Sequence, residues 1–244
     1  MRKASTKKVS TQLTWAREHR HIPWDWIVDE TREAERVSSW DDPADYMHAV
    51  RRSYRKDLWA AQPHHVEVWS EKGTVRGTLS PVLNEYGVAF RVMHGFASAT
   101  AVHEAAGESR IRGFTVLYVG DRDPSGMHMS EIDLPRRLER YEANILIRRI
   151  ALRRDDVDDL PHFDLASKRG DARHDCYRRF YGNRCWELDA MNPVDPRERV
   201  AGEIEQFIDW PAWERAQKAE AAEIATIDHV LGRWRQAISG PDPE

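Results

Sequence analysis

The fold of this chain can be inferred from one segment, Phe114-Thr-Val-Leu-Tyr-Val-Gly-Asp121-Arg-Asp123-Pro124-Ser-Gly126. Its first six residues are β-prone and mostly apolar, which is typical of a buried parallel strand bounded by turn residues. The turn holds two aspartates at positions i and i+2, and a proline and a glycine then lead the chain toward a helix. Because ligands bind beyond the carboxyl ends of such strands in open α/β sheets, we expect Asp121 and Asp123 at the functional edge of the sheet.

A second motif places another carboxylate beside this pair. The short β-prone run Val66-Glu-Val-Trp69 is followed by Glu71-Lys72-Gly73. If the two strands are parallel neighbours, Glu71 meets the aspartates at one edge of the sheet. One glutamate and two aspartates are a sufficient ligand set for one or two Mg²⁺ ions, or for Mn²⁺, with water and substrate phosphates filling the remaining positions. For each motif alone, a solvated surface turn is the favoured interpretation.

The two motifs together resemble the Toprim domain, the metal-dependent catalytic fold of topoisomerases, bacterial primases and several nucleases. The similarity is greatest to the A subunit of the archaeal type IIB topoisomerase and to uncharacterised bacterial Toprim proteins. The second motif of these proteins runs Asp-x-Asp-Pro-x-Gly, as residues 121–126 do, and their first-strand glutamate falls on Glu71. Further matches are Lys168-Arg-Gly-Asp171-Ala-Arg173 and Trp186-Glu187-Leu-Asp189-Ala-Met191. The resemblance covers residues 60–208.

The resemblance implies an α/β, Toprim-like (Rossmann-like) fold with a mostly parallel sheet flanked by helices. Hydrophobic periodicity agrees, because predicted strands alternate with predicted helices as in parallel βαβ units. We expect an N-terminal helical extension over residues 1–62, a catalytic domain over 63–208 and a long helical tail over 209–244. The strands are predicted at 66–70, 88–92, 114–119, 145–150 and 185–189, and the helices at 75–86, 98–106, 125–140, 172–181, 197–208 and 213–238. Another helix is predicted from the Asp42-Pro43 pair through Leu58.

The charge distribution favours a nucleic-acid partner. The net charge is −4, but Arg136 to Arg184 carry 13 Lys and Arg against 9 Asp and Glu, a local charge of +4. A basic region beside an acidic metal site suits a phosphodiester substrate, since cations hold the backbone while carboxylates hold the metal. DNA is favoured over RNA.

The composition indicates a globular protein of the cytoplasm. Hydrophobic residues make up 41% and charged residues 32% of the chain, which is enough apolar material for a packed core. No apolar run approaches the roughly 20 residues that span a bilayer, and the basic start is not followed by the apolar region of a secretory signal. Cys176 and Cys185, the two cysteines, are expected to be free thiols, and no membrane partner is expected.

Specific roles follow for the residues of these motifs. Glu71 is either a metal ligand with Asp121 and Asp123 or the general acid–base, and Lys72 neutralises charge that develops on the phosphate. His128 follows the aspartates by a helical turn and is a candidate for touching a phosphate or relaying a proton. Glu187 and Asp189 share one face of the last predicted strand and are candidate supporting residues. The predicted nucleic-acid contacts are Arg122, Lys168, Arg169 and Arg173.

The expected activity is Mg²⁺-dependent cleavage of phosphodiester bonds. The topoisomerase subunits carry a nucleophilic tyrosine on a winged-helix domain before the Toprim domain. Residues 1–65 are too few for that domain in full, and the tyrosines among them, Tyr46 and Tyr54, lie on a predicted amphipathic helix. Hydrolysis therefore fits better than strand passage, and residues 1–62 are interpreted as the remnant of a winged-helix linker. Relatives of this fold often work as dimers, so we expect a homodimer or a partner subunit. Whether such a partner supplies a nucleophilic tyrosine is left open by the sequence.

Two alternatives from other classes remain open. The first is a nucleic-acid-binding or scaffold subunit with a vestigial metal site, in which the acidic C-terminal helix docks a partner. The second is a phosphatase with a phosphoaspartate at Asp121, since an Asp-x-Asp after a strand also serves that chemistry. The second alternative leaves Glu71 unexplained.

Overall fold

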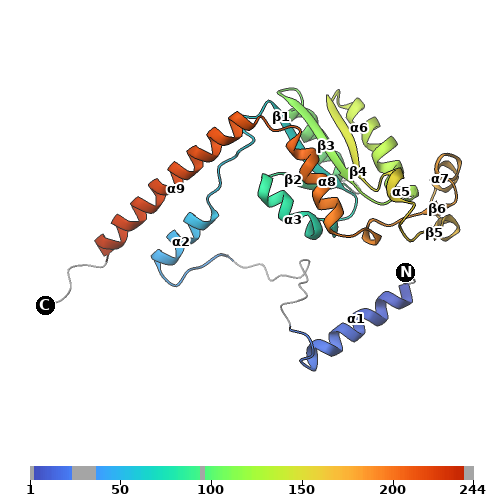
Figure 1. The fold of residues 1–244 in the computed structure, drawn as a ribbon, viewed down its shortest axis with the longest axis horizontal. Helices are drawn as coiled ribbons and strands as arrows, with labels where there is room; N and C mark the ends of the chain where they lie inside the picture. The colour runs from blue at the N-terminus through green and yellow to red at the C-terminus, as the bar shows by residue number, and fades with distance from the viewer. Residues whose placement is uncertain (1–2, 24–36, 94–96, 239–244) are drawn as a thin grey trace. The chain divides into compact units, whose positions relative to one another are not determined.

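The computed structural model describes residues 3–23, 37–93 and 97–238 (Figure 1). The chain divides into two compact units, Met1–Val50 and Arg51–Glu244, and each is described by itself. Residues 24–36 of the predicted N-terminal extension lie outside the described part. The division falls at Val50, and the C-terminal helix belongs to the larger unit.

The larger unit is built on a parallel sheet of four strands in the order β2-β1-β3-β4. Val68 of β1 pairs with Phe90 of β2 and with Leu117 of β3, which in turn pairs with Arg148 of β4. The two central strands, β1 and β3, come from the two motifs that predicted the fold. The α/β class and the mostly parallel sheet are therefore confirmed. The strands are β1 (His64–Ser70), β2 (Ala89–Val92), β3 (Gly113–Val119) and β4 (Ile145–Ala151).

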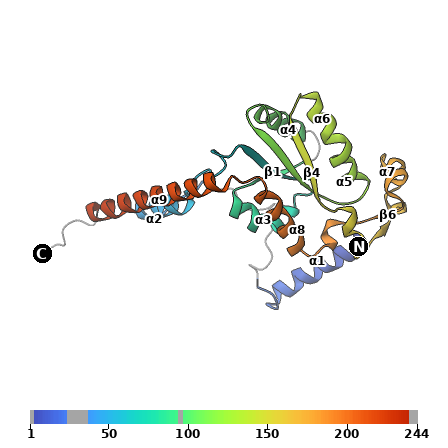
Figure 2. The same ribbon diagram turned by 45° about the horizontal axis from the view of Figure 1, so that its top comes forward.

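Helices cover both faces of this sheet because successive side chains of the central strands point to opposite faces. On β1, Val66 and Val68 pack into one core with α3 (Val75–Tyr86) and α8 (Val194–Glu205), and Trp69 packs into a second core. Figure 2 shows α3 and α8 on one side of the sheet and α4 and α6 on the other. The second core includes side chains of α4 (Ala97–Glu108) and α6 (Leu134–Arg140).

The helical run that follows the aspartates has three parts. It starts as α5 (Pro124–His128), passes through the π-helical turn η2 (Met129–Asp133) and continues as α6. The prediction of a helix over 125–140 is confirmed, although the π turn was not anticipated. A small lobe adjoins α5 at the end of the sheet (Figure 1). The lobe contains η4 (Leu165–Lys168), α7 (His174–Tyr181) and the antiparallel pair β5 (Phe163–Asp164) and β6 (Arg184–Cys185).

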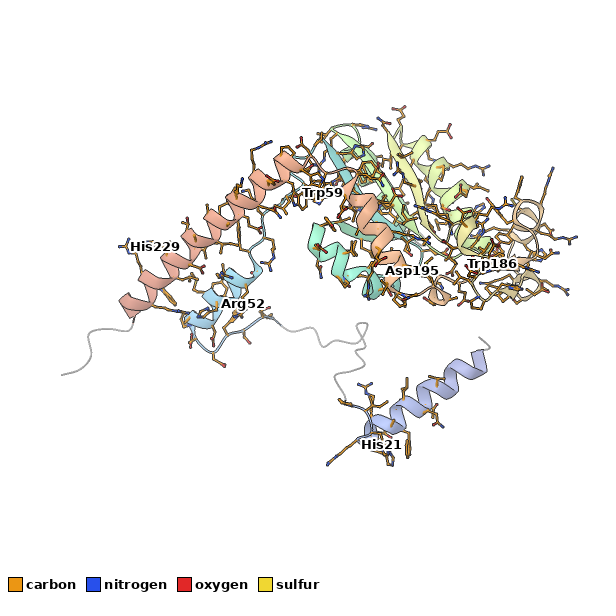
Figure 3. All side chains as sticks on the ribbon, in the orientation of Figure 1. His21, Arg52, Trp59, Trp186, Asp195 and His229 are labelled. Carbon is orange, nitrogen blue, oxygen red and sulfur yellow. The ribbon has the colours of Figure 1, made fainter. Side chains whose placement is uncertain are left out.

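The C-terminal helix α9 (Trp210–Ile238) is confirmed, and its first turns are anchored in the main core. The rings of Trp59 and Trp213 meet edge to face with centroids 5.7 Å apart, and Trp59 Nε1 donates a hydrogen bond of 2.6 Å to the Tyr86 carbonyl. Figure 3 marks Trp59 near the point where α9 leaves the domain. No described helix is long and apolar enough to cross a membrane.

Two sequence-based predictions of secondary structure are wrong. Residues 185–189 are not a fifth parallel strand: β6 ends at Cys185, and the 3₁₀ turn η5 (Leu188–Ala190) follows. The helix α2 (Pro43–Ser53) ends before Tyr54 and does not continue to Leu58. Tyr54 leaves the helical path because its hydroxyl donates a hydrogen bond of 2.5 Å to Glu223 of α9. In the smaller unit, α1 (Lys3–Glu18) is helical.

Candidate metal centre

Glu71 and the two aspartates meet at the carboxyl edge of the sheet, as the sequence predicted, because β1 and β3 are parallel neighbours. Glu71 follows β1 directly, and Asp121 and Asp123 follow β3. The two aspartates are buried, with exposed fractions of 4% and 2%. Buried carboxylates need compensating partners, and each of these two has both a backbone amide and a lysine.

Asp123 is the N-cap of α5. Its Oδ1 accepts a hydrogen bond of 2.8 Å from the amide of Gly126, and Pro124 occupies the first helical position. Its other oxygen, Oδ2, lies 2.9 Å from Nζ of Lys168, which is a residue of the lobe. Gly126 must be glycine, because a Cβ atom there would overlap the Asp121 carbonyl and lie 3.0 Å from Glu71 Oε1. The Asp-x-Asp-Pro-x-Gly pattern is therefore a packing requirement of this site.

Asp121 is held between the sheet edge and the segment after β6. Its Oδ1 accepts a hydrogen bond of 2.8 Å from the amide of Leu188, and its Oδ2 lies 2.8 Å from Nζ of Lys72. Trp186 exchanges two backbone hydrogen bonds with Arg122, at 2.9 and 3.0 Å, which fixes this segment beside the aspartates. Figure 3 labels Trp186 at the end of the sheet near the lobe. These contacts replace the fifth strand that the sequence had predicted.

The side chain of Arg149, a residue of β4, holds the loop that carries the two aspartates. Its guanidinium donates hydrogen bonds to the carbonyls of Gly120 and Asp121, to the Gly126 carbonyl at 3.2 Å and to Ser130 Oγ at 2.6 Å. Burial lowers the pKa of Arg149, but carbonyl dipoles on several sides hold its positive charge. This residue was missed from the sequence. The available signal was a pair of arginines, Arg148-Arg149, inside an otherwise apolar strand.

Burial is the main cause of the unusual pKa of Glu71. It raises the pKa to about 7, and the charges of Asp123 and Asp121 add to this effect, whereas a hydrogen bond with Ser125 and the charge of Arg149 oppose it. Burial also raises the pKa of Asp121. The two aspartates act on Glu71 more strongly than Arg149 does, so a divalent cation beside these three carboxyl groups would favour their ionised form.

The donor set fits a hard divalent cation in its chemistry. All three side chains offer carboxylate oxygens, the ligands that Mg²⁺ and Mn²⁺ prefer. Beside them the Tyr118 hydroxyl is buried with no hydrogen-bond partner among the described residues, and burial together with the charge of Glu71 raises its pKa. Such an orphaned polar atom is costly unless water or a ligand reaches it. Lys72 and Lys168 must release the aspartate oxygens, or share them, when a cation binds.

The predicted phosphate-binding cations lie around the same edge but differ in their surroundings. Lys168 is paired with Asp123, and Arg173 donates a hydrogen bond of 3.3 Å to Ser125 Oγ. Arg122 stacks on the ring of Tyr181 with its Cζ 5.4 Å from the centroid. Arg169 is exposed. The structure brings these four side chains toward one end of the sheet, and their contact with a phosphate stays a prediction.

The structure places the three candidate supporting residues, Asp189, Glu187 and His128, in different surroundings. Asp189 is exposed and its Oδ2 lies 3.6 Å from Nζ of Lys72, so it belongs to the same charge network. Glu187 is exposed, and the two do not share a strand face, because η5 starts at Leu188. His128 lies on α5, where burial and then the charge of Arg173 lower its pKa.

Another group of potential ligands lies at the start of β1. Donor atoms of His65, Glu67 and Glu108 lie within 4.8 Å of one another, a closer grouping than the carboxylates of the sheet edge form in the described structure. Glu67 is nevertheless fully occupied, because Arg91 binds both of its oxygens, at 2.6 and 2.9 Å, and Trp69 donates a hydrogen bond of 2.7 Å. The guanidinium of Arg91 already supplies the positive charge that a metal ion would bring, so we interpret this group as a structural network.

Comparisons of this chain with protein-family models, with curated proteins and with solved structures found no match. The Toprim resemblance therefore stays a prediction from the sequence motifs.

Proposed function

We propose that this chain is a Toprim-type nuclease that uses Mg²⁺ or Mn²⁺ to cleave phosphodiester bonds in nucleic acid, with DNA preferred over RNA. The observation that supports the proposal most is that three carboxyl groups, of Glu71, Asp121 and Asp123, come together at the carboxyl ends of β1 and β3. Burial, and then the charges of the two aspartates, raise the pKa of Glu71 to about 7, although Lys72 and Lys168 are paired with the aspartates. Buried carboxyl groups with a raised pKa at one edge of a sheet are typical of functional sites.

The two aspartates and Glu71 would hold the metal. When bound there, a divalent ion supplies Lewis-acid polarisation of the phosphodiester and a lower pKa for water at the site. The amides of Leu188 and Gly126 each bind one oxygen of an aspartate. The second oxygen of each aspartate, which now contacts a lysine, is the one that would bind the metal. The amide hydrogen bonds thus orient both carboxylates before any substrate binds.

Glu71 is the residue suited to proton transfer. A carboxyl group with a pKa of about 7 is present in both protonation states at neutral pH, which is the condition for an effective general base or acid. Gly126 leaves room for its side chain, and Ser125 provides a hydrogen bond. Glu71 would accept a proton from the attacking water in its ionised form.

Lys72 and Lys168 are suited to the substrate phosphate. Burial opposes their protonation, but the hydrogen bonds to Asp121 and Asp123 outweigh it, so the pKa of each lysine is raised and each ammonium is charged at neutral pH. When a cation takes the aspartate oxygens, these ammonium groups become free to bind phosphate oxygens.

The proposal is tested by incubating supercoiled plasmid and single-stranded RNA with the protein in Mg²⁺, Mn²⁺ or EDTA. Cleavage that needs the metal and falls ~100-fold or more in Glu71→Gln and Asp123→Asn supports the nuclease. Asp228→Asn is the matched control, because Asp228 is an exposed aspartate on α9 that pairs with Arg51 and belongs to no part of this charge network. Equal cleavage by all variants, or no cleavage of either substrate, would overturn the proposal.

One observation favours a binding subunit with a vestigial site as the second candidate. Both aspartates are already paired with lysines, an arrangement that can persist without a metal. This alternative expects nucleic-acid binding that is the same in EDTA and in Mg²⁺, with no cleavage. Hydrolysis of phosphate monoesters that requires Asp121 and not Glu71 would instead support the phosphoaspartate alternative.

A further inference from the structure

A small hollow lies between α5 and α7, beside the candidate metal centre. Its enclosed volume is only about 30 Å³, which is room for one or two water molecules. One wall comes from α5 and η2, including Met127 and His128, and the other comes from α7, including Tyr177, Phe180 and Tyr181. We refer to these five residues as the aromatic hollow. A ring system is too large to enter it, so a flat ligand would lie against its open rim, where Phe180 is exposed.

The rings of the aromatic hollow are tilted against one another, by 40° between Tyr177 and Tyr181 and by 56° between Phe180 and Tyr181, and part of the lining is open to solvent. Phe180 is 66% exposed, although a side chain of its kind is usually buried. The rings of Tyr177 and Tyr181 lie 5.1 Å apart between centroids, so Tyr181 is braced by a buried neighbour. The lowered pKa of His128 keeps its ring neutral at pH 7. Aromatic surfaces of this kind bind nucleobases by stacking, without regard to sequence.

Arginines surround this apolar surface. Arg173 lines the hollow and hydrogen-bonds Ser125, Arg122 lies over the ring of Tyr181, and Arg179 lies over the ring of Phe180 with its Cζ 5.7 Å from the centroid. A neutral apolar ligand would gain nothing from the positive charge of these arginines. The combination of flat rings and guanidinium groups complements a ligand that joins aromatic bases to phosphates.

The hollow is continuous with the candidate metal centre. Pro124, which also lines it, directly follows Asp123. Ser125 bridges the two places, because its hydroxyl accepts a hydrogen bond from Arg173 and its side chain hydrogen-bonds Glu71. A strand whose phosphate lies at the carboxylates therefore has a base next to this hollow.

We propose that the exposed rim of the aromatic hollow, at Phe180, stacks on one unpaired nucleobase of a nucleic-acid strand, with the adjoining phosphate held by Arg173 next to the carboxylates. This inference rests on the proposed function and names the form of its substrate. A base inside a duplex is paired and stacked, so it must be extruded at a cost before it can stack on this rim. The site therefore prefers single strands, frayed ends or flaps over continuous duplex.

The two cysteines provide a test without metal or cleavage. Cys176 is exposed and lines the hollow, whereas Cys185 is buried. In EDTA, a saturating single-stranded oligonucleotide is expected to slow the alkylation of Cys176 by maleimide roughly tenfold, and the blunt duplex of the same sequence is expected to slow it much less. Equal protection by both forms, or protection by neither, would overturn the inference.

Variants check that the rim of the hollow itself binds the base. Phe180→Ala is expected to weaken binding of the single-stranded oligonucleotide roughly tenfold in EDTA, in line with the loss of one stacked base. Ile111→Ala is the control, because Ile111 is an apolar side chain with 85% exposure in the turn before β3. Unchanged binding by Phe180→Ala contradicts the inference.

The failures of the two proposals can be told apart. If cleavage depends on Glu71 and Asp123 but Phe180→Ala binds single strands as tightly as the unaltered protein, the nuclease stands and the base site is wrong. If single strands protect Cys176 but no substrate is cleaved, the base site stands and the nuclease is wrong.

Discussion

Nζ of Lys168 lies 2.9 Å from Oδ2 of Asp123. Lysine and a divalent cation therefore compete for the same oxygen. Removing the ammonium in Lys168→Met is expected to tighten Mn²⁺ binding about 5- to 10-fold, because one positive charge near 4 Å is worth about 1 kcal/mol or more. The same variant is expected to weaken nucleic-acid binding. Titration with Mn²⁺ measures the first effect, and Arg169→Met, an exposed neighbouring cation, is the control. Weaker Mn²⁺ binding by Lys168→Met would speak against this competition.

The raised pKa of Glu71 has a consequence for stability. A glutamate with an ordinary pKa of 4.5 in the unfolded chain and about 7 in the folded one binds more protons when folded. Stability therefore falls as the pH rises through this window, and the cost is fully present above pH 7. Glu71→Gln removes the charge and is expected to raise the free energy of unfolding at pH 8 by about 1–3 kcal/mol, since each pKa unit is worth about 1.4 kcal/mol.

Urea unfolding at pH 8 and pH 5 measures this effect. The advantage of Glu71→Gln is expected to shrink strongly at pH 5, where most of the folded protein carries a protonated Glu71. Glu187→Gln, an exposed glutamate near the same site, is the control and should be close to neutral at both pH values. A Glu71→Gln variant that is less stable at pH 8 contradicts the electrostatic account.

Gly126 and Gly77 make a matched pair. Gly126→Ala forces a Cβ atom onto the Asp121 carbonyl and against Glu71, and is expected to destabilise the protein by about 1–3 kcal/mol and to abolish metal binding. Gly77 lies in α3 with nothing near its Cβ position, so Gly77→Ala is expected to stabilise by about 0.5–1 kcal/mol. Thermal unfolding of both variants checks the prediction. Equal effects of the two substitutions would show that the close approach at Gly126 is unimportant.

Arg149 and Arg148 are neighbours on β4, but Arg149 hydrogen-bonds backbone carbonyls of the aspartate loop and Arg148 forms an ion pair with Glu203. Arg149→Met removes the donor to the Asp121 carbonyl and to Ser130 Oγ, while the Gly120 carbonyl keeps the Leu152 amide, and is expected to cost about 3 kcal/mol. Arg148 pairs with Glu203 at the surface and its side chain is 37% exposed, so Arg148→Met is expected to cost about 1 kcal/mol or less. Urea unfolding distinguishes the two. A larger loss from Arg148→Met than from Arg149→Met would refute this assignment.

The sheet and its acidic edge could be predicted because their signals are local. The apolar run before Asp121 and the shorter run before Glu71 each identify a strand and the turn after it, and parallel pairing then brings the carboxylates together. Cys185 to Asp189 also alternates like a strand. There, however, contacts that are remote in sequence determine the backbone: Trp186 pairs with Arg122, and the Leu188 amide is taken by Asp121.

The partners of the site residues were harder to predict for the same reason. Lys168 looked like a phosphate ligand, and nothing local indicates that it reaches Asp123. Arg149 is one of two adjacent arginines, and the sequence does not say which of them turns into the protein. The lobe that carries Lys168 and the aromatic hollow consists of short elements with weak periodicity, so its packing on α5 could not be derived.

Manganese binding at pH 8 tests the central claim most directly. Free Mn²⁺ is measured by electron paramagnetic resonance during titration of the unaltered protein, Asp123→Asn and Asp228→Asn, the last an exposed aspartate on α9 paired with Arg51. The account predicts that the unaltered protein and Asp228→Asn bind Mn²⁺ alike and that Asp123→Asn loses the binding. Equal binding by Asp123→Asn, or no binding by the unaltered protein, would contradict a metal centre at Glu71, Asp121 and Asp123.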